Sequence, residues 1–170
     1  MTHLSTSDLV TATAGKAVVA GERAITAGLT TDSRAITPGC VFLALCGERF
    51  DGNTFAAEAS QKGAAAVVVS RVEGDFAPGC TVVQVEDTLA ALQSLATWWR
   101  GQLEPLHVVG LTGSSGKTST KDMCLSVLSQ KYEALATKGN LNNHIGVPLS
   151  ILSTPQGTRA AIWEMGMNHA

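Results

Sequence analysis

A glycine-rich segment, TGSSGKTS at 112–119, lies between an apolar, strand-like run at 106–111 and a helical pattern. Glycines let successive backbone N–H groups point into one concavity, and the N-terminus of the following helix adds positive potential there. In such a loop Lys117 would reach the outer phosphates of a nucleotide, and the Thr118 hydroxyl would be offered to Mg²⁺. A strand, a phosphate loop and a helix in this order predict a parallel α/β sheet.

The segment departs from the common pattern G-x-x-x-x-G-K-[ST]. That pattern requires a glycine where the chain has Leu111, and Gly110 lies one residue too early. Because G-K-T alone is frequent by chance, a purely structural glycine turn is the alternative. The flanking strand and helix favour a site for a nucleoside triphosphate. The residues expected to bind it are Gly113, Ser114, Ser115, Gly116, Lys117, Thr118 and Ser119.

Composition excludes several classes of protein. The chain has 170 residues, 45% of them hydrophobic, which is enough for one good core or two small ones. Its net charge of −2 argues against a nucleic-acid partner. The sequence contains no apolar tract of about 18 residues and no charged and apolar leader, so we expect no membrane insertion and a cytoplasmic location.

The four cysteines are scattered and form no C-x-x-C pair. Most of them lie in apolar runs, and their spacing matches no zinc pattern. We therefore interpret them as reduced packing residues. The four histidines are equally dispersed, so zinc binding is not predicted for them either.

Two units are predicted along the chain, at 1–84 and 85–170. The first should be a small α/β unit that opens with a helix at 5–14, in which Ser5 and Asp8 have capping-box spacing. A second helix should run from Asn53 to Lys62 and end at Gly63. Strands are expected around 24–30, 41–45, 64–70 and 82–85.

The second unit should begin with a helix after Asp87, followed by the strand ending at Leu111 and by the phosphate loop. The next helix is amphipathic and carries Met123, Cys124, Val127 and Leu128. A polar loop at 137–146, the start of a helix at 148–152 and a strand at 159–163 complete the pattern. This order predicts the opening, and only the opening, of a parallel sheet wound with helices.

Glu164 directly follows the last predicted strand. Ligands of such sheets bind beyond the carboxyl ends of the strands, so Lys117 and Glu164 are expected in one crevice. There the carboxylate would hold the Mg²⁺ that bridges nucleotide phosphates. The alternative is a solvated residue at a strand end.

Several motifs in one order resemble a known family. The segments TDSR (31–34), PGCVFLALCG (38–47) and DGNTF (51–55) resemble the substrate domain of the Mur ligases. The phosphate loop, GNLNN (139–143) and EMG (164–166) are similar to the member that joins D-alanyl-D-alanine to UDP-N-acetylmuramoyl-tripeptide. That family's own loop has the same shortened form.

The resemblance implies an ATP-dependent ligase of peptidoglycan precursor synthesis, which phosphorylates a carboxylate and lets an amine displace the phosphate. It implies that 1–84 bind a UDP-sugar and that 85–170 begin the central ATP-binding domain. Lys117 and Glu164 would be catalytic, with Thr118 and Glu164 on Mg²⁺.

The resemblance also implies substrate contacts. Ser33 and Arg34 match the segment that faces the UDP-sugar, although a turn closed by Asp32 is the alternative. Asn142 and Asn143 would hydrogen-bond substrate near the γ-phosphate, although Asn-rich loops often satisfy their own hydrogen bonds.

Similar ligases are longer, so we expect a truncated form that does not ligate alone and that self-associates through an exposed sheet edge. Three alternatives stay open. One is a P-loop kinase or nucleotide switch, and another is a module that binds UDP-sugar without catalysis. The third is a related Mur or folylpolyglutamate-type ligase.

Overall fold

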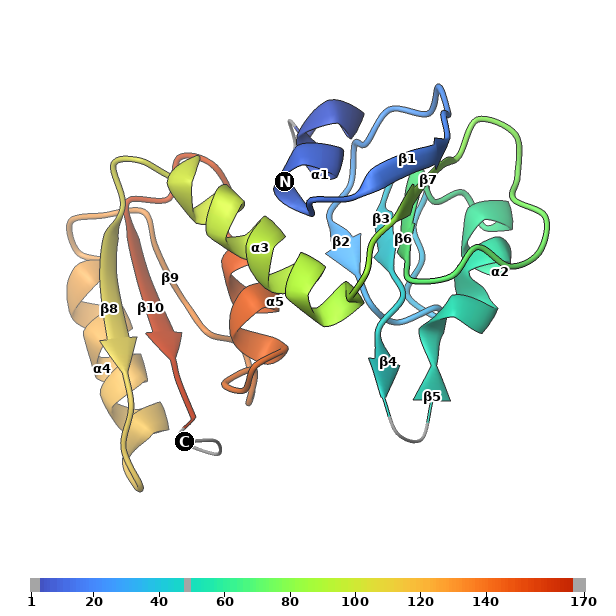
Figure 1. Ribbon diagram of the computed structural model, residues 1–170. Helices are drawn as coiled ribbons and strands as arrows, with labels where there is room; N and C mark the ends of the chain where they lie inside the picture. Colours follow the sequence, from blue (N-terminus) through green and yellow to red (C-terminus); the bar gives the residue numbers. More distant parts are fainter. Residues whose placement is uncertain (1–3, 48–49, 167–170) are drawn as a thin grey trace. The chain divides into compact units, whose positions relative to one another are not determined.

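The computed structural model describes residues 4–47 and 50–166. The chain divides into two compact units, one ending at Leu95 and the other starting at Ala96. Both are α/β units with mainly parallel sheets (Figure 1). The boundary lies inside helix α3 (Thr88–Gly101), whereas the sequence analysis placed its division before this helix.

The first unit contains a five-stranded sheet in the order β1-β7-β6-β3-β2 (Figure 1). Strand β1 is antiparallel to β7, and the other neighbours are parallel. Central β6 is buried along its whole length, as expected for a parallel strand covered on both faces. The strands are β1 (Lys16–Val19), β2 (Leu29–Thr30), β3 (Val41–Leu43), β6 (Ala66–Val69) and β7 (Thr81–Gln84).

Local capping explains where the helices of this unit begin. Helix α1 (Thr6–Ala12) starts at Ser5, whose hydroxyl accepts from the backbone N–H of Asp8 while the Asp8 carboxylate accepts from that of Ser5. This confirms the predicted capping box.

The helix predicted from Asn53 to Lys62 is split into a 3-10 turn, η1 (Gly52–Phe55), and α2 (Ala56–Gln61). The Asp51 carboxylate caps the 3-10 turn by accepting from the backbone N–H of Asn53. A short hairpin of β4 (Cys46–Gly47) and β5 (Phe50–Asp51) precedes the turn.

One core cluster of the first unit lies between its sheet and α2. Phe42, Val67 and Val82 from three adjacent strands pack in one cluster with Ala56 and Ala59 of α2. Cys40 and Cys80 are buried in the same cluster and form no disulfide.

The second unit holds a three-stranded parallel sheet in the order β8-β10-β9. The two connections run in opposite directions across the sheet, and right-handed crossovers then place their helices on opposite faces. Figure 1 shows α4 and α5 on the two faces. The elements are β8 (His107–Leu111), α4 (Lys117–Leu128), β9 (Ala134–Ala136), α5 (Gly146–Leu152) and β10 (Ala160–Glu164).

The apolar stripe of α4 lies at the surface. Met123 and Val127 are 69% and 70% exposed. They line an apolar hollow of about 470 Å³ with Val109, Cys124 and Leu128. None of the helices in the described part of the chain is long and apolar enough to cross a lipid bilayer.

Candidate functional site

The glycine-rich loop connects the carboxyl end of β8 to the first residue of α4, Lys117. Gly116 caps the helix with φ of +75°, a left-handed conformation that favours glycine, and no side chain caps the first turn. A Cβ added at Gly116 would meet no atom within 4 Å. The loop thus presents an open helix N-terminus, which is the geometry of an anion site.

Lys117 folds back over this loop. Its Nζ donates to the carbonyl oxygen of Gly113 at 2.6 Å, and the side chain is partly buried. The other polar side chains of the loop and first turn are exposed, and they are Ser114, Ser115, Thr118 and Ser119. The ammonium is therefore close to the phosphate cradle and is held by a backbone carbonyl that a phosphate can replace.

Glu164 lies beside the start of the loop, because its register partner in neighbouring β8 is Leu111. The residue is only 4% exposed. Its backbone N–H donates to Thr137 Oγ1, and its Oε1 accepts from Asn142 Nδ2, both at 2.9 Å. Its Oε2 is buried and has no hydrogen-bond partner among the residues that the structure describes.

Lys121, one turn after Lys117 in α4, was not predicted from the sequence. Its side chain is 7% exposed, and its Nζ lies 3.9 Å from Glu164 Oε2. A lysine four residues after the phosphate-loop lysine, on a helix that packs on the sheet, was the available signal. Thr137 was also missed, since nothing in the sequence pairs it with residue 164.

These residues fit a magnesium ion. An unpartnered, buried carboxylate oxygen is a hard ligand of the kind that Mg²⁺ prefers, and Mg²⁺ is usually held by one or two carboxylates plus substrate phosphates. The described residues contain no group of three or more His, Cys, Asp and Glu side chains that could hold a metal by themselves. The donor set therefore suits a metal that arrives with phosphate oxygens.

Asn142 and Asn143 of the Asn-rich loop make different contacts. Asn142 orients the Glu164 carboxylate, and its carbonyl oxygen accepts from the Gly166 N–H. Asn143 Oδ1 accepts from the backbone N–H groups of Ile145 and Gly146, where α5 begins. The Asn143 oxygen is thus used by the loop itself.

Ser33 and Arg34 lie in the first unit, directly after β2. Asp32 Oδ1 accepts from the backbone N–H of Arg34, so the turn considered as an alternative is present. The Arg34 guanidinium also binds the Asp32 carboxylate through two nitrogens, which lowers the pKa of that carboxyl to about 2. The Arg34 side chain is still 87% exposed, and the Ser33 carbonyl accepts from Lys62 Nζ.

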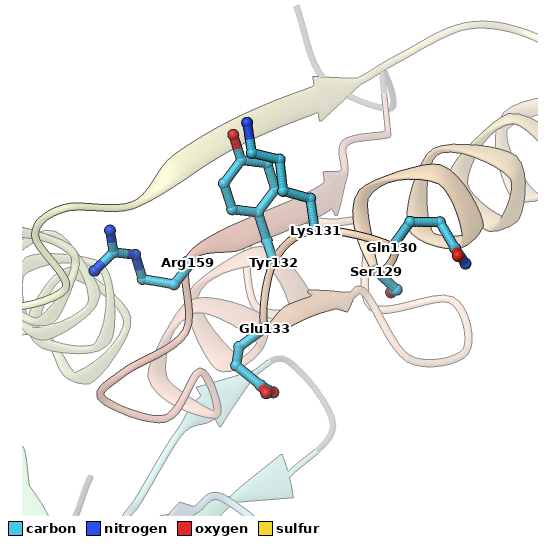
Figure 2. A pocket seen from close by; sticks show the side chains of 6 residues that line it. All are labelled: Ser129, Gln130, Lys131, Tyr132, Glu133 and Arg159. Atoms are coloured by element: carbon cyan, nitrogen blue, oxygen red, sulfur yellow. The ribbon is translucent and has the colours of Figure 1, made fainter.

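A second hollow, of about 500 Å³, lies at the other end of the second unit's sheet, where α4 has ended and β9 and β10 begin. Figure 2 shows Lys131 over the Tyr132 ring, while Glu133 and Arg159 point in other directions. The lining side chains do not converge on a common point, so this hollow has no built site. The lining residues are Ser129, Gln130, Lys131, Tyr132, Glu133 and Arg159.

Two family models match the chain. The model described as Mur ligase family, catalytic domain, matches residues 26–99, and the Mur ligase middle domain matches residues 111–170. The fold and the site therefore belong to a known class, and the chain is a member of the Mur ligase family.

Within this family the chain is MurF-like. UDP-N-acetylmuramoyl-tripeptide–D-alanyl-D-alanine ligase of Escherichia coli is 49% identical over 83% of this chain, and that of Bacillus subtilis is 44% identical over 86%. These matches cover 30% and 32% of the two relatives. The chain thus spans about a third of their length and corresponds to their amino-terminal portion.

Solved structures agree with this assignment. MurF from Acinetobacter baumannii superposes with a TM-score of 0.87 at 38% identity, over 97% of this chain and 36% of that one. MurF from Thermotoga maritima in complex with ADP gives 0.74 at 35% identity, over 85% of this chain and 33% of that one. The resemblance inferred from the motifs is confirmed.

Proposed function

We propose that this chain is the amino-terminal part of an ATP-dependent ligase that joins D-alanyl-D-alanine to UDP-N-acetylmuramoyl-tripeptide. The relatives named for this reaction support it. The observation that carries it is the buried, unpartnered Glu164 Oε2 beside an open phosphate loop. That pairing fits ATP with Mg²⁺, and the Thermotoga maritima MurF complex with ADP supports the nucleotide.

Lys117 and the backbone N–H groups at 113–119 would hold the β- and γ-phosphates. The ammonium would exchange the Gly113 carbonyl for phosphate oxygen. Thr118 and Glu164 would hold Mg²⁺, which when bound neutralises phosphate charge during transfer. Asn142 donates to Glu164 Oε1, which would leave Oε2 to hold the metal.

The chemistry requires activation of a carboxylate, because its oxygen is a poor leaving group. The γ-phosphoryl group of ATP passes to a carboxylate oxygen of the tripeptide, giving an acyl phosphate and ADP. The amine nitrogen of the dipeptide then attacks the carbonyl carbon and loses a proton, and phosphate leaves. The residues of this chain contribute positioning and charge neutralisation to the first step.

The proposal also covers the roles of the two domains, the substrate contacts, the cellular location and self-association. We assign 1–84 to the UDP-sugar substrate and 85–170 to the first part of the ATP-binding domain. Ser33 and Arg34 would face the UDP-sugar, and Asn142 and Asn143 would lie near the γ-phosphate. A cytoplasmic location, and self-association through a sheet edge, belong to the same proposal.

The first test replaces Lys117 by Ala in the full-length protein. Loss of the phosphate-binding charge should lower ATP turnover by about 10²–10³-fold with the circular dichroism spectrum unchanged. Lys131→Ala, which removes an exposed charge of the same unit far from the loop, should turn over normally. Near-normal turnover of Lys117→Ala would refute the nucleotide site.

A second assay identifies the substrates. The full-length protein receives ATP, UDP-N-acetylmuramoyl-tripeptide and one candidate amine at a time, and phosphate release is followed. Release that depends on both the tripeptide and D-alanyl-D-alanine supports the proposal. Release with a different amine would indicate a related ligase, and release without the tripeptide would indicate a kinase or nucleotide switch.

A further inference from the structure

Lys121 and Glu164 form a buried pair of opposite charges that are only loosely in contact. Their side chains are 7% and 5% exposed, and Nζ and Oε2 are 3.9 Å apart, beyond hydrogen-bond distance. Within residues 4–47 and 50–166, Oε2 has no hydrogen-bond partner. Burying two charges costs free energy that only close contact and further hydrogen bonds repay, so this pair is a poor stabilising element.

The position of Lys121 on α4 offers its ammonium a second anionic partner besides Glu164. Residues four apart lie on the same side of a helix, so Lys121 follows Lys117 along the face that carries the phosphate-loop lysine. Its flexible four-carbon stem lets the ammonium move between neighbouring anions. In the structure its anion is Glu164, and on the proposed function a nucleotide phosphate would be close by.

We propose that Lys121 is a resident counter-ion of Glu164 that keeps magnesium out until nucleotide is present. Without nucleotide, the ammonium neutralises the buried carboxylate and repels a metal ion from Oε2. When nucleotide and Mg²⁺ bind together, the phosphates accept the ammonium while Oε2 passes to Mg²⁺. Magnesium and nucleotide then bind as a coupled pair, and Lys121 acts as a positioning residue for the metal ligand.

This inference rests on the proposed function, because it assumes that Glu164 holds magnesium beside a bound nucleotide. It predicts a reciprocal coupling between the two ligands that depends on the charge at position 121. Removing that charge should leave Oε2 exposed to metal at all times. It should also remove one phosphate contact that forms only when magnesium is bound.

The test titrates MgCl₂ and ADP separately and together into wild-type and Lys121→Met protein by isothermal titration calorimetry. For Lys121→Met we expect binding of Mg²⁺ alone to be about tenfold tighter, which corresponds to about 1.4 kcal/mol. We expect binding of ADP at saturating Mg²⁺ to be several-fold weaker, and binding of ADP in EDTA to change little. If Lys121 were merely structural, its replacement would neither tighten the binding of Mg²⁺ alone nor weaken the binding of ADP at saturating Mg²⁺.

Three further variants make the outcome decisive. Lys121→Arg keeps the charge and should retain weak binding of Mg²⁺ alone. Lys121→Gln removes the charge but keeps polarity, and it replaces Lys121→Met if that protein fails to fold. Glu164→Gln should abolish binding of Mg²⁺ alone in either background.

Each failure has its own signature. If Glu164→Gln abolishes magnesium binding while neutral residues at position 121 leave the Mg²⁺ affinity unchanged or weaker, the counter-ion role of Lys121 is wrong and the metal site stands. If magnesium binds Glu164→Gln as it binds wild type, the proposed metal site itself is wrong, and the role of Lys121 falls with it.

Discussion

Asp51 has several polar partners in the first unit. It accepts from the backbone N–H of Asn53, pairs with Arg71 at 2.6 Å and accepts from the Cys46 thiol. These contacts, the backbone hydrogen bond first, lower the pKa of its carboxyl from 3.8 to about 2. The single carboxylate thus joins a hairpin, the start of η1 and the loop after β6.

A pH dependence of stability follows from that lowered pKa. Because the folded pKa lies below the ordinary value of 3.8, the contribution of Asp51 is fully present above about pH 4 and is lost as the pH falls through about 2. Asp32 adds an effect of the same sign in the same range. We expect urea midpoints to fall between pH 4 and pH 2, and to fall less in Asp51→Asn.

The control for this measurement is Asp75→Asn, which changes an exposed acidic residue of the same unit. Its pH dependence should follow that of wild type. An Asp51→Asn protein with the full wild-type loss of stability between pH 4 and pH 2 would show that these contacts are not formed in solution.

The cysteines differ strongly in accessibility. Cys46 is exposed, whereas Cys40 and Cys80 are 2% and 1% exposed, and burial raises the pKa of the Cys80 thiol to about 11. The thiolate is the reactive form, so a buried thiol with a raised pKa is inert. We expect a disulfide reagent at pH 8 to label Cys46 fast and Cys40 and Cys80 only after unfolding.

Mass spectrometry of the labelled peptides checks this prediction. Cys46→Ser should remove the fast label at that position and leave the labels of Cys40 and Cys80 unchanged. Fast labelling of Cys80 in the folded protein would contradict the buried core of the first unit.

At the scale of elements, helix α3 carries the largest fully buried side chain of the described residues. Trp99 is 1% exposed, and its Nε1 donates to the carbonyl oxygen of Thr154 at 2.9 Å, which ties α3 to the end of α5 in the second unit. Trp98 next to it is half-buried.

Replacing Trp99 by Ala should lower the free energy of unfolding by about 3–5 kcal/mol, because it leaves a large cavity. Trp99→Phe keeps most of the apolar volume and loses the hydrogen bond to Thr154, so a loss of about 1 kcal/mol is expected from that bond. Guanidinium unfolding gives both values, with Trp98→Ala as the neighbouring control at about 1 kcal/mol or less. Equal losses for Trp98→Ala and Trp99→Ala would contradict the packing described.

Sequence patterns identified the elements that have strong local signals. The capping box of α1, the apolar run of β6 and the glycine loop before α4 are visible residue by residue. Strands β1 and β9 were missed, because β1 is exposed along its whole length and β9 has three residues in a polar surrounding. Both are strands because a neighbour in the sheet pairs with them, and that pairing is not encoded locally.

The residues of the site show the same difference between local signals and long-range contacts. Lys117 was predicted from the phosphate-loop motif and Glu164 from its place at the end of a predicted strand, and parallel pairing brings the ends of β8 and β10 together. Lys121 and Thr137 contact Glu164 only through tertiary packing, and no spacing in the sequence relates them to it. Positions that act through long-range contacts are therefore where sequence reasoning falls short.

On the scale of the whole molecule, the two sheets leave different edges open. Strands β8 and β9 are the edges of the second unit's sheet, and β1 and β2 are those of the first. Edge strands are protected by charge, and β1 begins with Lys16, whereas β8 (HVVGL) has no Lys, Arg, Asp or Glu. Val108 of β8 and Val18 of β1 have the same exposure, 39%, so they form a matched pair.

We expect self-association of this chain to proceed through β8 and to be reduced by a charge there. Val108→Lys should shift the weight-average mass in sedimentation velocity toward the monomer at concentrations where the wild type associates, because a lysine disfavours pairing of one edge with another. Val18→Lys places the same charge on an edge that already carries one, and its mass distribution should match that of wild type. If Val18→Lys dissociates the assembly and Val108→Lys does not, the β1 edge is the one that associates; a wild type that is monomeric at every concentration would exclude both edges.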